Sequence, residues 1–108
     1  MDLPHGYRLS LDPAELQLDA IHAYLTRSYW SPGIPKGLVA KAIANSVCIG
    51  AYGPDSAQVG FARLVTDHAT FGYLADVYVL EAHRGRGLSR AMVEALLAPM
   101  EVQGLRRI

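Results

Sequence analysis

A segment near the carboxyl end of the chain combines two glycines with three arginines, in the order Arg84-Gly85-Arg86-Gly87-Leu88-Ser89-Arg90. Glycine lets a ligand approach the backbone closely, and each arginine adds a full positive charge. Apolar residues recur at helical spacing after Gly87, so the segment is predicted to open a helix. A helix N-terminus offers unpaired N–H groups and about half a unit of positive charge. The segment therefore predicts an anion site, best suited to a phosphate or pyrophosphate.

A strand and a helix must position this loop. Apolar residues run almost unbroken through residues 71–80, as expected for a strand covered on both faces. The helix after Gly87 carries its inward stripe on Leu88, Ala91, Met92, Ala95 and Leu96. We expect this helix to break near Ala98, because Pro99 cannot supply an interior helical N–H.

Two common phosphate loops do not fit the segment. The P-loop needs Gly-Lys-Ser or Gly-Lys-Thr, and neither occurs in the chain. The dinucleotide fingerprint needs a small residue where this chain has Arg90, and the given sequence ends before a second strand could supply a ribose-binding acid. A plain glycine-rich turn in any α/β domain is the structural alternative, although such a turn needs neither the arginines nor this spacing of glycines.

The pattern Arg-Gly-x-Gly-Leu-Ser, with Val79 five positions before Arg84, resembles motif A of the Gcn5-related N-acetyltransferases (GNAT), an acyl-CoA-dependent family. Ser89 stands where that family often has Gly or Ala, and serine is small enough to keep the backbone accessible. Further segments resemble the amino-terminal half of a small bacterial branch of the family; they are Tyr29-Trp30, Gly33-Ile34-Pro35, Ile43-Ala44-Asn45-Ser46, Val59-Gly60-Phe61-Ala62-Arg63 and Thr66-Asp67.

The resemblance implies that amides of residues 84–90 hold the pyrophosphate of acetyl-CoA. It also implies that the backbone of Val77, Tyr78 and Val79 pairs with the pantetheine arm, as an added strand pairs with a sheet edge. The implied activity is N-acetyl transfer from acetyl-CoA to an unidentified amine. The alternative is a catalytically inactive acyl-CoA-binding or assembly module.

The general base is the least defined part of the predicted site. An alkylammonium acceptor has a pKa near ~10.4 and must lose its proton before it attacks. Asp76, on the strand beside the expected thioester, is the first candidate, and a strand carboxylate hydrogen-bonded to a neighbour is the alternative. Tyr24, Tyr29 and Trp30 are predicted either to wall an acceptor pocket or to pack in the core. We expect no metal, since no His, Cys, Asp and Glu residues have ligand spacing.

Composition limits the function classes. The chain has 108 residues, enough for one domain, and ten basic residues balance ten acidic ones, so no global field favours nucleic acid. Cys48 is the one cysteine and lies in an apolar run, so we expect a buried thiol. No segment approaches the ~18 apolar residues of a membrane span and no signal peptide opens the chain, which favours a cytoplasmic protein.

Turn and cap signals divide the amino-terminal half. Pro13 and the capping-box spacing of Asp12 and Glu15 predict a helix with Ala14, Leu18, Ile21 and Leu25 inward. Pro35 is predicted to open a second helix with Leu38, Val39, Ala42 and Ile43 inward. Strands are expected at residues 7–9, 47–52 and 58–65, with turns at 53–56 and 67–70.

The predicted fold is a single α/β (α+β) domain over residues 1–108, with a mixed, mostly antiparallel sheet flanked by helices. It stops after the motif-A helix, as a fifth strand begins at residues 105–108. The resemblance implies further strands and a helix, whose tyrosine protonates CoA, beyond that point. We therefore expect the strand at residues 74–80 to lack the further neighbouring strands that the family usually provides, and the chain to form a homodimer or larger homo-oligomer. A loosely folded monomer is the alternative.

Overall fold

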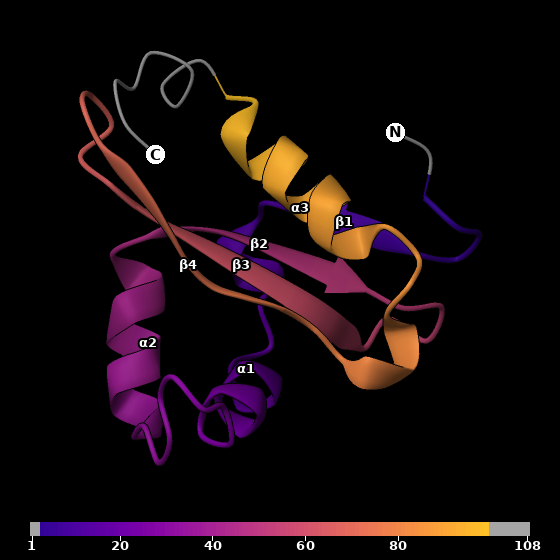
Figure 1. Ribbon diagram of the computed structural model, residues 1–108, viewed down its shortest axis with the longest axis horizontal. Helices are drawn as coiled ribbons and strands as arrows, with labels where there is room; N and C mark the ends of the chain where they lie inside the picture. The colour runs from indigo at the N-terminus through magenta and orange to yellow at the C-terminus, as the bar shows by residue number, and fades with distance from the viewer. Residues whose placement is uncertain (1–2, 100–108) are drawn as a thin grey trace.

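The computed structural model describes residues 3–99, which form a four-stranded antiparallel sheet in the order β1-β2-β3-β4 with three α-helices (Figure 1). The strands are β1 (Arg8–Ser10), β2 (Val47–Tyr52), β3 (Gln58–Thr66) and β4 (Gly72–Val79). The helices are α1 (Leu18–Leu25), α2 (Lys36–Ala44) and α3 (Leu88–Leu97), with short 3-10 turns at Pro13–Glu15 and Glu81–His83. This arrangement confirms the predicted fold class. The strand expected at residues 105–108 lies outside the described residues.

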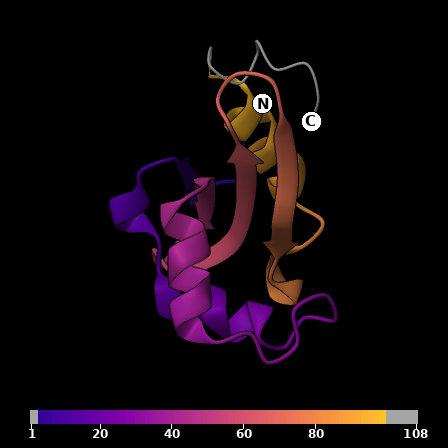
Figure 2. The same ribbon diagram turned by 90° about the vertical axis from the view of Figure 1, so that its left-hand side faces the viewer.

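Helices cover both faces of the sheet, with α3 on one face and α1 and α2 on the other (Figures 1 and 2). Alternation along the strands explains the two layers, because successive side chains point to opposite faces. In β3, Ala62 and Leu64 join a core cluster with Met92 of α3, whereas Phe61 joins a second cluster with Ile21 of α1. Cys48 is buried in the second cluster, as expected, and burial raises the pKa of its thiol to about 11.

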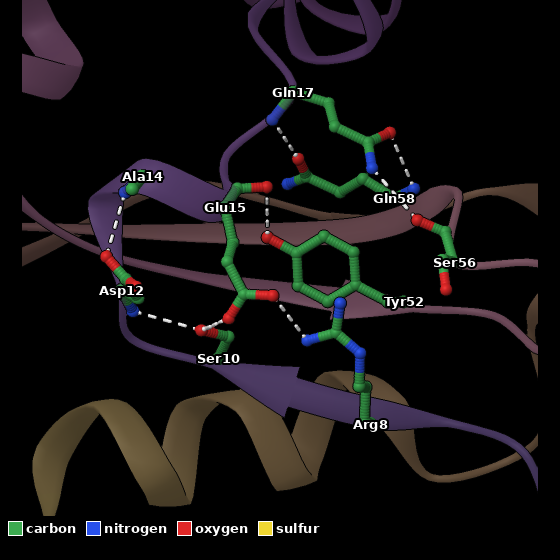
Figure 3. Close-up of polar contacts among 9 residues, drawn as sticks. All are labelled: Arg8, Ser10, Asp12, Ala14, Glu15, Gln17, Tyr52, Ser56 and Gln58. Atoms are coloured by element: carbon green, nitrogen blue, oxygen red, sulfur yellow. Dashed lines mark hydrogen bonds and ion pairs between the residues drawn. The ribbon is translucent and has the colours of Figure 1, made fainter.

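The first helix begins later than the capping signal predicts. Asp12 does accept a hydrogen bond from the Ala14 amide at 2.9 Å, but the cap supports only the 3-10 turn. The Glu15 carboxylate, expected to complete a capping box, instead accepts from the Ser10 hydroxyl at 2.6 Å and pairs with Arg8 at 2.8 Å (Figure 3). These two donors, the hydroxyl first, lower the pKa of Glu15. The inward position predicted for Ala14 is therefore wrong, and its side chain is exposed.

A reciprocal glutamine pair explains why the chain stays extended before α1. The Gln17 amide donates to Gln58 Oε1 at 2.8 Å, and the Gln58 amide donates to Gln17 Oε1 at 2.9 Å (Figure 3). Gln17 is held against the start of β3 in a β conformation, so the helix can start only at Leu18. Leu38 in α2 is a second correction, because it is 53% exposed rather than inward.

The turns and the last helix follow the sequence signals closely. Gly53 N–H donates to the Ala57 carbonyl at 3.0 Å and closes the β2–β3 hairpin. Asp67 accepts from the hydroxyl and amide of Thr70 and from the amides of Ala69 and Phe71, which together hold the pKa of its carboxyl well below the usual value. Helix α3 ends at Leu97, ahead of Pro99 as expected.

None of the helices in the described part of the chain is long and apolar enough to cross a membrane.

The two phenylalanines provide a matched test of the core. Phe61 projects from β3 and is fully buried in the cluster with Ile21 of α1, whereas Phe71 is 46% exposed. Phe61→Ala is expected to lower the free energy of unfolding by about 3–5 kcal/mol, because it removes packed apolar volume. Phe71→Ala should cost far less. Urea unfolding curves measure both, and Ile49→Val, expected to cost about 0.5–1.5 kcal/mol, covers the case in which Phe61→Ala does not fold. Equal losses for both phenylalanines would contradict the described core.

Candidate functional site

A cleft of about 760 Å³ opens where the end of β4 meets the beginning of α3. Figure 1 shows the chain leaving β4, passing through the turn at Glu81–His83 and reversing into α3. Nine of the ten residues that the sequence predicts to bind the cofactor line this cleft, and Arg86 does not. The nine are Val77, Tyr78, Val79, Arg84, Gly85, Gly87, Leu88, Ser89 and Arg90. The structure thus brings the predicted strand and loop together around one cavity.

The loop exposes its backbone because both glycines have left-handed conformations. Gly85 has φ +78° and Gly87 has φ +77°, values that side-chain-bearing residues rarely adopt. The first helical hydrogen bond of α3 runs from the Ala91 amide to the Gly87 carbonyl at 3.0 Å. The preceding amides of Leu88, Ser89 and Arg90 have no acceptor among residues 3–99. A helix terminus with free amides and a favourable dipole is suited to an anion.

The exposed edge of β4 forms the second wall. Within the described residues β4 pairs only with β3. The Leu80 amide donates to the Val59 carbonyl of β3. Because neighbouring residues of a strand point their N–H and C=O groups to opposite sides, those of Val79 point to the open edge of β4. The Val79 carbonyl already accepts from Arg84 Nε at 2.9 Å. A ligand that pairs with this edge therefore finds the Val79 amide free and the carbonyl occupied.

The three arginines of the loop have different environments. Arg84 lies along the strand edge, with Nη2 also 3.3 Å from the Tyr24 hydroxyl. Arg90 forms an exposed ion pair with Glu94 at 3.0 Å, a kind of pair that contributes little to stability. Arg86 points away from the cleft, and its guanidinium lies 5.7 Å from the centre of the Tyr7 ring. Arg84 is consequently the arginine fixed at the junction of strand and loop.

Four cleft residues were not predicted as cofactor-binding from the sequence: Tyr24, His83, Val93 and Glu94. The Tyr24 ring stacks on the Tyr78 ring with centroids 3.9 Å apart and planes 6° apart. His83 Nδ1 lies 2.8 Å from the hydroxyl of Tyr7, the residue just before β1, and this contact supports the turn at Glu81–His83. Val93 and Glu94 could have been inferred from their place one turn after Ser89. Tyr24 carried no such signal, because only tertiary packing brings α1 to β4.

Asp76 lies outside this cleft. Its Oδ2 accepts from Arg63 Nε at 2.9 Å and its Oδ1 accepts from Trp30 Nε1 at 2.9 Å. It lines a separate cavity of about 70 Å³ on the α2 side of the sheet. The structure thus contains the arrangement that the sequence allowed as the alternative, a strand carboxylate bonded to neighbours. The role of general base stays a prediction.

Among residues 3–99, no group of three or more His, Cys, Asp or Glu side chains could hold a metal ion.

Comparison with known proteins identifies the family. Residues 20–108 match the sequence model of the acetyltransferase (GNAT) family, and the chain belongs to this family. A Xanthomonas campestris protein of the GNAT family, described as a putative acetyltransferase, is 45% identical, and its crystal structure superposes with a TM-score of 0.91 over 98% of this chain and 74% of that chain.

A Gibberella zeae protein, also described as a putative acetyltransferase, is 38% identical in an alignment that covers 83% of this chain. This chain spans 62% of that relative's length. A Mycobacterium tuberculosis protein solved in complex with CoA shares the fold, with a TM-score of 0.65 over 83% of this chain and 55% of that chain, at 22% identity.

Two glycines give a matched test of the loop geometry. Gly87→Ala places a side chain at φ +77° and is expected to lower the free energy of unfolding by about 1–2 kcal/mol. Gly37→Ala, inside α2 with nothing within 4 Å of the added carbon, is expected to raise it by about 0.5–1 kcal/mol. Urea unfolding measures both variants. If Gly87→Ala is as benign as Gly37→Ala, the loop does not hold Gly87 in the left-handed region.

Proposed function

We propose that the chain binds acetyl-CoA in the cleft between β4 and α3 and acts as an N-acetyltransferase toward an amine. The observation that carries the proposal is the set of free amides at Leu88, Ser89 and Arg90, presented beside an open strand edge. Family membership and the shared fold of the CoA-bound Mycobacterium tuberculosis protein support it.

The pyrophosphate would lie over the start of α3, where the loop amides and the Arg84 charge face it. The pantetheine arm would run back along β4 from Val79 to Val77 and pair with the strand edge. This path points the thioester toward the middle of β4. There the amine nitrogen attacks the thioester carbonyl, a C–N bond forms, the C–S bond breaks, and CoA leaves as the thiol after taking up the proton that the amine loses.

Reversing one charge in the cleft tests acetyl-CoA binding. Arg84→Glu is expected to weaken the affinity for acetyl-CoA at least about tenfold, because a carboxylate would then face the pyrophosphate. Lys41→Glu makes the same charge change on α2, away from the cleft lining, and should leave the affinity unchanged. Isothermal calorimetry with acetyl-CoA measures both variants. Equal affinities for wild type and Arg84→Glu would show that this loop is not the phosphate site.

Turnover requires its own experiment. Release of the CoA thiol is measured against a panel of amines, with the Xanthomonas campestris relative run in parallel. Thiol release that depends on the amine supports the acetyltransferase. Acetyl-CoA binding without release by this chain would favour the alternative, an acyl-CoA-binding module.

The proposal includes a homo-oligomer in the cytoplasm. Val65, Phe71 and Tyr73 are large apolar residues exposed around the β3–β4 hairpin, beside an edge strand that pairs only with β3 in residues 3–99. Such surfaces favour association. Light scattering over a dilution series is expected to show a mass above that of one 11.7 kDa chain. A monomer at every concentration would refute self-association and leave the proposed activity untouched.

A further inference from the structure

Asp76 joins three parts of the fold that are far apart in the sequence. Its carboxylate contacts Arg63 on β3 and Trp30 in the segment between α1 and α2. We propose that Asp76 is a positioning residue, which through Trp30 holds residues 26–35 against the sheet as a wall beside the cleft. Only the assignment of that wall to the amine acceptor rests on the proposed function.

Backbone geometry directs Asp76 toward these partners. Arg63 pairs with Ala75 and Phe61 with Tyr78, so between these pairs β3 advances two residues and β4 three. The extra residue is a β-bulge, a feature that re-aims side chains. Asp76 has φ +54°, a conformation that Asp and Asn tolerate better than most other residues. The bulge lets Asp76 face the α2 side, while Leu74 and Val77 both pack toward α3.

Arg63 is fixed from its other side. Its Nη1 donates to the Ser46 hydroxyl at 3.1 Å, and that hydroxyl donates to the Ala42 carbonyl at 2.7 Å. The side chains of Arg63 and Asp76 are only 18% and 12% exposed. Removing one member of a mostly buried pair leaves the other charge without its partner, so the pair constrains the geometry of both. The end of α2 thus anchors Arg63, and Arg63 anchors Asp76.

The segment at residues 26–35 depends on this anchor. Its backbone groups bond within the segment and to α1: Gly33 N–H donates to the Thr26 carbonyl, Ser31 N–H donates to the Ser28 hydroxyl, and the Ile34 carbonyl lies 3.0 Å from His22 Nε2. Within residues 3–99, the bond from Trp30 to Asp76 is the one hydrogen bond that ties this segment to the sheet. Loss of the bond should therefore loosen the segment without removing its internal turns.

Trp30 then places the wall. Its ring lies 6.2 Å from the Tyr24 ring and 5.2 Å from the Tyr29 ring. These three aromatics line a cavity of about 600 Å³ next to the cleft, and Tyr24 and Arg84 belong to both cavities. An amine held there would reach the cleft past Tyr24. Through Trp30, Asp76 sets the shape of the surface along which the acceptor approaches.

Asp76→Asn is the informative variant because an amide has one acceptor oxygen where the carboxylate has two. Asn tolerates the positive φ. Because Arg63 and Trp30 donate to different oxygens of Asp76, the NH2 group of Asn replaces one of these acceptors, and one of the two bonds is lost. Trp30→Phe removes the donor and keeps an aromatic ring. Asp19→Asn is the control, since it makes the same chemical change on α1 at an exposed residue that pairs with Lys36.

Hydrogen exchange followed by mass spectrometry reads the segment directly. Asp76→Asn and Trp30→Phe are each expected to speed exchange at Ser31 and Gly33 about tenfold, as loss of one hydrogen bond would allow. Asp19→Asn should match wild type. Trp30 is the single tryptophan, so acrylamide should also quench its fluorescence more strongly in Asp76→Asn. Unchanged exchange and quenching would overturn the proposal, and Trp30→Phe decides it if Asp76→Asn does not fold.

Activity separates positioning from proton transfer. With a productive amine, a positioning role predicts that Trp30→Phe and Asp76→Asn both raise KM for the amine while acetyl-CoA affinity stays within about twofold. Loss of kcat in Asp76→Asn alone, with normal exchange, would assign it as the base and refute positioning. If wild type fails to bind acetyl-CoA, the proposed function fails, whereas the exchange and quenching results still judge the role of Asp76.

Discussion

The register between β3 and β4 changes by one residue at the middle of β4. The cleft beside α3 and the position of the Asp76 carboxylate both depend on that change. On its loop side, the strand presents Val77 and Val79 toward α3 and its open edge toward the cleft. At the bulge itself, a carboxylate faces the opposite layer and finds an arginine and an indole. A regular strand would have sent Leu74 and Val77 to opposite faces, and one of them would have left the core.

Local signals in the sequence were sufficient to place the glycine-rich loop before α3, the hairpins and the end of α3. Glycines, turn residues and Pro99 constrain the backbone only within a few residues of their own positions, so the local sequence is enough to predict their effect. The predicted start of the first helix was wrong because Gln17 is held by Gln58 on β3, a residue far away in the sequence. Likewise, the pairing of Trp30 with Asp76 and the stacking of Tyr24 on Tyr78 are tertiary contacts for which spacing offers no signal.

The cleft is a place where backbone amides have no hydrogen-bond partner among residues 3–99. Two glycines adopt left-handed conformations, which glycine tolerates, and three amides at the start of α3 have no acceptor in the described part of the chain. The surroundings compensate with order, because Tyr7 contacts His83 before the loop and Leu88 is buried immediately after Gly87. A rigid frame around exposed amides lowers the entropy lost on binding an anion, which is the usual advantage of pre-organisation.

Cys48, near the start of β2, has a practical consequence for chemistry on this protein. It is the one cysteine, it is 8% exposed, and burial raises the pKa of its thiol to about 11. The nucleophilic thiolate is therefore nearly absent at neutral pH, and chromogenic disulfide reagents would meet little competition from the folded chain. For the same reason, a cysteine introduced on an exposed helix face would be the preferred attachment point for a maleimide dye or spin label.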